Sequence, residues 1–257
     1  MQKLKKLSVL FFAFLLLGCY EVNEEIVINE NGSGTFVTRM DMSQLLEMMQ
    51  GMGGEEMAKE GLDRPIDTVF MMKSFVDSAK EITAEQKQLL ANGKMRMQMN
   101  MDKKVFKIDT DFPFANYGQL QQLLAGTGGM SALGGVMKKV FGKDGEENNQ
   151  PDSPKDPGMG EMADIFDATV NNGTISKKVN KAKFDALMSK PESDQMKQLG
   201  TSGIEILYTT VIRLPRPVKS SDNPLIKLSD DKKTLTIKYN YLEVFENPEK
   251  FNYTITY

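Results

Sequence analysis

The chain has 257 residues, with 32 Lys and Arg, 35 Asp and Glu, a single Cys, and neither His nor Trp. The mild acidic excess provides no basic face for nucleic acid, and the lack of His removes the commonest general base and zinc ligand. Ser-His-Asp and Cys-His catalysis are therefore excluded, and the sequence predicts no catalytic residue, metal ligand or cofactor. Carboxylate-only and Ser-Lys chemistry stay open.

The first 18 residues have the pattern of a secretory signal. Lys3, Lys5 and Lys6 precede the almost wholly apolar run 7–17. At about 1.5 Å per helical residue, this run is too short for a hydrocarbon core of about 30 Å. We therefore predict a cleaved signal peptide over residues 1–18 rather than a membrane-spanning helix.

The end of this run, Leu16-Leu17-Gly18-Cys19, resembles the lipobox of bacterial lipoprotein precursors, in which a small residue precedes a cysteine that receives diacylglycerol. Cys19 is the single cysteine and cannot form an internal disulfide. The resemblance implies lipidation of Cys19 and attachment to a membrane of the cell envelope, the outer membrane more than the inner. Acyl chains contribute about 0.8 kcal/mol per buried CH₂, so two or three chains anchor a protein firmly. A plain signal peptide with an incidental cysteine is the alternative.

Apolar and polar residues alternate along 19–42, a pattern that is typical of a β-hairpin. Val22, Glu24, Ile26 and Ile28 share one side of the first strand, and 29–34 is rich in Asn and Gly. Such residues tolerate the positive φ of tight turns. We predict a hairpin with its turn at 29–34.

Three helical segments are predicted after this hairpin. The first starts at Ser43, a suitable N-cap, and stops at Gly51. The second starts at Pro65 and has apolar residues near helical spacing: Val69, Phe70, Met72, Val76 and Ala79. The third has a capping box formed by Thr83 and Gln86 and ends at Asn92-Gly93.

Residues 94–112 have the clearest strand pattern. Methionines at every second position alternate with Lys, Arg, Gln and Asn, and the return arm alternates as well. This predicts a half-buried antiparallel hairpin. The methionine side either packs on helices or lines an adaptable apolar ligand surface; its members are Met95, Met97, Met99 and Met101.

A hairpin followed by a helix occurs three times along the chain. Residues 117–129 repeat the Gln-Leu and Gly-Gly pattern of residues 42–54, and each stretch follows a hairpin. The third instance is a hairpin over 165–179 with a turn at Asn171-Asn172-Gly173, followed by a helix over 181–189. This favours a repeated ββα unit, with chance similarity of short strings as the alternative.

Residues 130–141 form an amphipathic stripe. The segment is interpreted as a core helix, as a cover over an apolar ligand surface, or as a surface that lies on a bilayer. Its candidate ligand-facing residues are Leu133, Val136, Met137 and Val140. The polar, Pro-containing stretch 143–160 is predicted to be a disordered linker.

The last third of the chain is predicted to be β. Residues 204–214 are β-branched and apolar, 225–228 and 235–241 flank a polar turn, and 251–257 alternate to the end of the sequence. We read the final segment as a sheet strand.

Two stretches resemble LppM-type lipoprotein domains: residues 26–34 (IVINENGSG) and residues 214–221 (LPRPVKSS). The resemblance implies an α+β fold with an antiparallel sheet and helices on one side, and an envelope protein in contact with lipid. It is confined to these stretches and carries over no ligand site.

The residues predict an α+β fold with a mainly antiparallel sheet built from hairpins and helices packed on one face. Residues 19–142 form its ββα-rich part and 161–257 the β-rich part of the same domain, separated by the 143–160 linker.

Three candidate functions are consistent with this sequence. They are a non-catalytic, membrane-anchored envelope lipoprotein that binds a hydrophobic ligand or a protein partner, a structural subunit of an envelope complex, and a carboxylate-dependent hydrolase. The hydrolase needs two carboxylates about 5–10 Å apart in a cleft.

Overall fold

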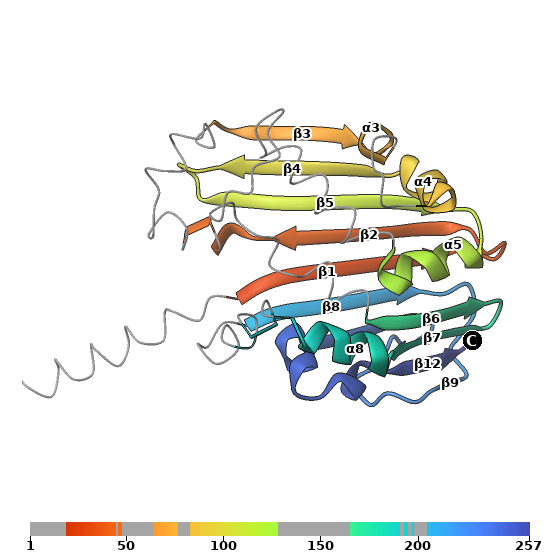
Figure 1. Ribbon diagram of the computed structural model, residues 1–257. Helices are drawn as coiled ribbons and strands as arrows, with labels where there is room; N and C mark the ends of the chain where they lie inside the picture. Colours follow the sequence, from red (N-terminus) through yellow and green to blue (C-terminus); the bar gives the residue numbers. More distant parts are fainter. Residues whose placement is uncertain are drawn as a thin grey trace, which may run out of the picture.

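Two β-sheets form the framework of the protein (Figure 1). The structure is a computed structural model and describes residues 19–44, 46–47, 64–76, 83–127, 165–190, 193–194, 197 and 205–257. Within these residues the large sheet has the strand order β10-β11-β8-β1-β2-β5-β4-β3, and the small sheet has the order β6-β7-β12-β9. β1 and β8 pair in parallel, and all other neighbouring strands pair antiparallel.

The large sheet contains eight strands. They are β1 (Cys19–Ile28), β2 (Gly34–Asp41), β3 (Ile66–Met71), β4 (Lys94–Asn100), β5 (Val105–Phe114), β8 (Glu205–Arg213), β10 (Lys227–Leu228) and β11 (Thr234–Asn240). The small sheet contains β6 (Phe166–Asn171), β7 (Thr174–Val179), β9 (Ser220–Ser221) and β12 (Tyr253–Thr256).

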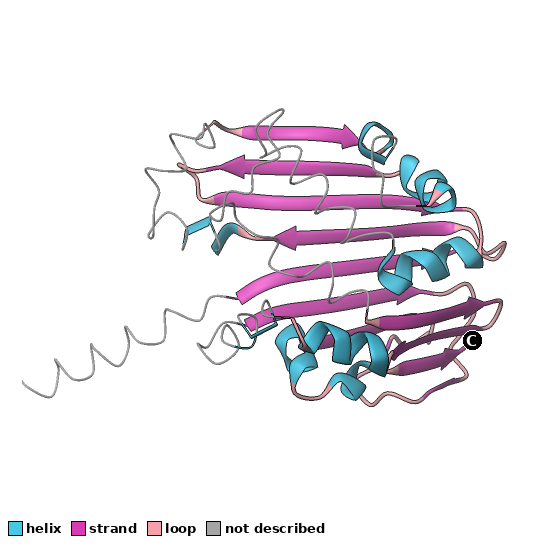
Figure 2. Cartoon of the chain, viewed as in Figure 1, coloured by secondary structure: helices cyan, strands magenta, loops and turns pink. Residues whose placement is uncertain are grey.

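Helices lie on one side of the large sheet, and Figure 2 shows the small sheet on that same side. The α-helices are α3 (Lys73–Val76), α4 (Ala84–Ala91), α5 (Tyr117–Gln122) and α8 (Lys181–Met188). A π-helical turn, Leu123–Thr127, continues α5, and two 3₁₀ turns, η2 (Tyr241–Phe245) and η3 (Pro248–Phe251), precede β12. The α+β prediction with helices on one face is confirmed. None of the helices in the described ranges is both long and apolar enough to cross a membrane.

The hairpins form where the alternation predicted them. β1 and β2 pair from Glu21 opposite Asp41 to Ile28 opposite Gly34. Their turn contains Gly32 at a φ of 80°, a conformation that costs glycine little. A Cβ on Gly34 would lie 1.8 Å from the Val27 carbonyl oxygen, so only glycine fits where the returning strand begins.

Three further local predictions are confirmed. α4 begins with the Thr83–Gln86 capping box, β4 and β5 form the methionine hairpin, and β6, β7 and α8 form the third hairpin and helix. In each case the turn and cap residues act locally, so the sequence pattern is sufficient to predict the element.

The predicted helix that begins at Pro65 is wrong. Residues 66–71 form the strand β3, which pairs with β4, and only the four-residue α3 follows it. Ile66, Val69 and Phe70 suit a strand as well as a helix, and an Arg96–Asp67 ion pair joins the two strands on their exposed side. Pairing with a neighbouring strand therefore outweighs the helical spacing of the apolar residues.

Several predicted segments lie outside the described residues. They are the signal peptide 1–18, most of the first helix after Ser43, the amphipathic segment 130–141 with Leu133, Val136, Met137 and Val140, and the linker 143–160. The described final segment is a strand as predicted, but β12 joins the small sheet between β7 and β9. A second sheet was not predicted.

Candidate functional site

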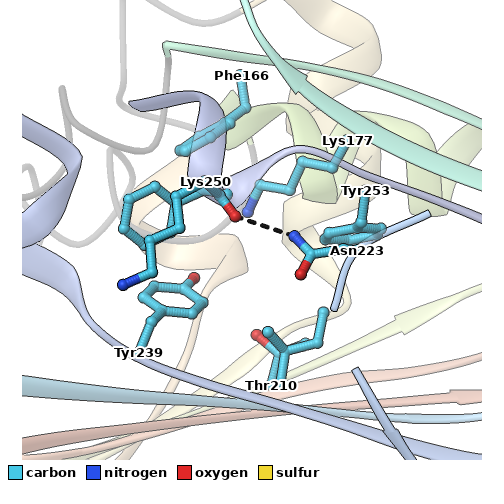
Figure 3. A pocket seen from close by; sticks show the side chains of 9 residues that line it. Phe166, Lys177, Thr210, Asn223, Tyr239, Lys250 and Tyr253 are labelled. Atoms are coloured by element: carbon cyan, nitrogen blue, oxygen red, sulfur yellow. Dashed lines mark hydrogen bonds between the residues drawn. The ribbon is translucent and has the colours of Figure 1, made fainter. Parts of the chain in front are cut away.

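A small pocket lies between the two sheets (Figure 3). Its walls come from β8 and β11 of the large sheet, from β6, β7 and β12 of the small sheet, and from η3 and the loop that follows β9. The lining residues are Phe166, Lys177, Thr210, Asn223, Ile237, Tyr239, Lys250, Phe251 and Tyr253. Its volume of about 10 Å³ is about that of one water molecule, whereas small-molecule sites occupy about 300–1,000 Å³.

Asn223 closes one side of this pocket. Its buried amide nitrogen donates to the carbonyl oxygens of Lys250 at 2.9 Å and Asn252 at 2.7 Å, and its amide oxygen accepts from the backbone of Leu225 at 2.8 Å. The Lys250 bond is drawn in Figure 3. The side chain thus fixes the loop after β9 to the turn before β12 and has a structural role.

A buried carboxylate lies beside the pocket, within the large sheet. Glu24 in β1 is directly opposite Thr210 in the parallel pairing with β8. Its two carboxylate oxygens accept hydrogen bonds from the Tyr208 hydroxyl at 2.8 Å and the Thr210 hydroxyl at 3.3 Å. Two hydroxyl donors satisfy part of the hydrogen-bonding capacity of a group that is costly to bury.

Aromatic rings surround this carboxylate. The Tyr208 ring stacks on Tyr239 and on Tyr241, each with a centroid distance of 5.2 Å, and Phe251 meets Tyr239 edge-on at 4.5 Å. Burial raises the pKa of Tyr208, Tyr239 and Tyr253 well above the ordinary tyrosine value, and the Glu24 carboxylate raises each of them further. These hydroxyls therefore stay protonated near neutral pH and do not act as bases there.

The chemistry available in the pocket is limited. Its lining contains no Asp or Glu, so the pocket does not supply the pair of carboxylates that a glycosidase-type hydrolase needs. Lys177 lies over the ring of Phe166, with its ammonium nitrogen 4.7 Å from the centroid. Among the described residues there is no group of three or more His, Cys, Asp and Glu placed to hold a metal ion.

The predicted methionine surface is buried. Met95, Met97 and Met99 all lie on the inner side of β4, and Met101 is half-buried in the following turn. Opposite Met95 on β5 is Thr110, which is 1% exposed and whose hydroxyl oxygen has no hydrogen-bond partner among the described residues. The inner side of the sheet thus combines a methionine-rich region with one unsatisfied hydroxyl.

The outer side of the large sheet is polar and ion-paired. Glu25 binds Arg213 at 2.9 Å and Arg39 at 3.4 Å, and Asp41 binds Lys107 at 3.0 Å. The hydrogen bond from Arg213, assisted by Arg39, holds the pKa of Glu25 below its usual range. Exposed pairs of this kind add little stability, and they leave the outer side well solvated.

Two of the exposed large apolar side chains among the described residues lie together on one edge strand of this sheet. Val69 and Met71 in the edge strand β3 are 58% and 52% exposed. An apolar edge strand is a common place for another strand to pair.

Cys19, the predicted lipidation residue, is the first residue of β1, and its backbone is in register with Glu205 of β8. The Glu24 cluster was not predicted, although Glu24 alternates with Val22 and Ile26 on the apolar side of β1. An acidic residue at such a position was the available signal.

Comparison of the chain with protein-family models, with curated proteins and with solved structures gave no match in any of the three.

Proposed function

We propose that the chain is a lipid-anchored protein of the bacterial cell envelope whose folded domain is a non-catalytic module that binds another protein. The observation that carries the anchor is the position of Cys19. The predicted acylation residue follows a basic and apolar leader and is also the first residue of a core strand. Acyl chains on Cys19 would therefore attach the sheet to the bilayer without an intervening linker.

The burial of the inner methionines and the small size of the pocket favour a protein partner over a small hydrophobic ligand. The inner methionines are buried, and the pocket between the sheets is the size of a water molecule. The exposed apolar side chains Val69 and Met71 lie instead on an open sheet edge. A surface of this kind is suited to main-chain pairing with another polypeptide.

A hydrophobic ligand is the second candidate, and the unpaired Thr110 hydroxyl on the methionine-rich side favours it. Buried polar groups without partners are uncommon, and a ligand atom is one explanation for such a group. In this case the ligand would be an amphiphile whose polar group contacts Thr110.

Native mass spectrometry of the purified full chain, together with the variant T110V, distinguishes the two candidates. The protein-binding proposal predicts no additional lipid-sized mass beyond the anchor. It also predicts that T110V raises the free energy of unfolding by about 1 kcal/mol, because an unpaired buried hydroxyl is replaced by a methyl group. A non-covalent lipid mass that T110V reduces would instead support the ligand.

The anchor is tested by growing a bacterial host with an alkyne-bearing palmitate analogue. Wild type should incorporate the label and fractionate with membranes, whereas C19A should lose the label completely and leave the membrane fraction. G18A is the matched control, because the residue before the cysteine stays small, and it should retain the label. Labelling of C19A, or an unlabelled wild type, would contradict the proposed anchor.

A further inference from the structure

The outer edge of β3 has backbone hydrogen-bonding groups that pair with no other strand of the described residues. The Met72 amide donates to the Gly93 carbonyl at 3.0 Å, which fixes the phase of the antiparallel pairing with β4. Because hydrogen-bonded residues alternate in such a pair, Thr68 and Phe70 direct their backbone groups toward β4. Asp67, Val69 and Met71 therefore direct theirs away from the sheet. Of these groups, the Met71 carbonyl accepts from the Ser74 hydroxyl at 3.1 Å.

The side chains of this edge do little to prevent pairing. Proteins commonly protect an edge strand with lysine, proline, a bulge or an unpaired inward charge. β3 contains neither lysine nor proline. Its single charged residue, Asp67, makes a bidentate contact with Arg96, with both N–O distances 2.9 Å. The outward-facing Val69 and Met71 are apolar and exposed.

The other edges of the described sheets are short or capped. β10 and β9 have two residues each. The edge strand β6 lies against α5, and the Val170 amide donates to the Gln121 side-chain oxygen at 3.1 Å (Figure 1). Within the described chain, β3 is thus the long edge that keeps open main-chain groups together with exposed apolar side chains.

We propose that β3 pairs antiparallel with β3 of a second copy of this chain, about a two-fold axis that passes midway between the two Val69 residues. This inference depends on the proposed protein-binding function and names the partner. In this register Val69 faces its own copy, Asp67 faces Met71 of the second copy, and Thr68 faces Phe70 of the second copy. Outward N–H and C=O groups then meet one another, and the strand pair is self-complementary, as an isologous contact requires.

Charge also favours a second copy in this register. Asp67 lies opposite an uncharged methionine and not opposite the Asp67 of the second copy, and its charge is already balanced by Arg96.

The two-fold axis is perpendicular to the sheet, so the two Cys19 residues lie at opposite ends of the joined sheet. Both anchors reach one bilayer when the strands run along its surface. A single strand pair buries less than a standard interface, so the dimer is weak and is best detected by covalent capture.

Disulfide capture with V69C in the full chain tests the pairing. Opposed residues in a hydrogen-bonded pair have Cα atoms about 5.5 Å apart, within the range that a disulfide spans. Mild oxidation of membranes should convert V69C to a species of twice the mass. L228C is the matched control, because Leu228 is an exposed apolar residue on the opposite edge strand β10, and it should stay monomeric, as should wild type.

Charge substitution at the axis tests whether the partner is a second copy. V69K places two like charges at the axis, and V69E does the same, so each should lower the dimer fraction at least about tenfold, as measured by sedimentation equilibrium of the detergent-solubilised chain. An equimolar mixture of V69K and V69E should restore the dimer. Circular dichroism melts equal to wild type show that the exposed substitutions leave the fold intact.

Absence of recovery in the mixture overturns the second-copy pairing. A V69C cross-link to a different protein also overturns it but leaves the proposed protein-binding function standing. A V69C chain that captures neither itself nor another protein overturns both. The labelling of Cys19 is independent of all three outcomes.

Discussion

Above pH 10 the protein is expected to lose stability steeply, by at least about 4 kcal/mol of unfolding free energy for each further pH unit. Tyr208, Tyr239 and Tyr253 have pKa values raised by burial and by the Glu24 carboxylate. In the unfolded chain they ionise near pH 10, while in the fold they stay protonated. The unfolded state then binds fewer protons than the native state, so stability falls as pH rises through this range. Each such group contributes about 1.4 kcal/mol per pH unit.

The measurement is urea unfolding at a series of pH values between 8 and about 11.5, with Y253F as the diagnostic variant. Tyr253 is buried in the pocket wall, and its replacement removes one of the titrating groups. The slope above pH 10 should decrease by about 1.4 kcal/mol per pH unit. A slope that is flat above pH 10, or that Y253F leaves unchanged, would show that these tyrosines are not buried as described.

Y208F is expected to lower the free energy of unfolding at pH 7 by about 3 kcal/mol. The Tyr208 hydroxyl donates to the buried Glu24 carboxylate at 2.8 Å, and its loss leaves that carboxylate with the longer Thr210 bond at 3.3 Å. Removing one partner of a buried charged group costs more than an ordinary hydrogen bond, because the remaining charge is left without water and without a full set of donors.

Y253F is the matched control for this change, because it removes the hydroxyl of a buried tyrosine in the adjacent pocket wall and leaves both hydrogen bonds to Glu24 in place. Its cost at pH 7 should be below about 1 kcal/mol, a range typical of changes away from such a network. In an E24L background, Y208F should also cost little, giving a coupling free energy of at least about 1 kcal/mol in the double-mutant cycle. Equal costs for Y208F in both backgrounds would contradict the Glu24–Tyr208 interaction.

Local signals explain which parts of the fold were predictable. The hairpins at 19–42, 94–112 and 165–179 contain their own alternation and turn residues, and α4 contains its own cap. The apolar residues of β3 fit both the spacing of a helix and the alternation of a strand. The decision came from pairing with β4, whose Arg96 binds Asp67 across 29 positions of the chain. No short window of sequence contains that contact.

The Glu24 cluster and the pocket depend on contacts between residues even farther apart in the sequence. Glu24 could have been noticed as an acidic residue among the apolar positions of β1, but its partner Tyr208 is 184 positions away. The parallel pairing of β1 with β8 brings the two side chains together. Likewise, the pocket exists because β12 joins β7 in a second sheet rather than extending the first. Strand order between distant segments is set by packing of the whole chain, which alternation alone does not encode.

The intact mass of the mature protein, purified from membranes of a host that acylates lipoproteins, tests the central claim most directly. We expect a chain that begins at Cys19 and carries the mass of a diacylglycerol, with or without one further acyl chain. A lipase that cleaves ester-linked chains should remove the mass of those chains. A chain that begins at another residue, or one that begins at Cys19 with an unmodified thiol, would contradict the lipid anchor.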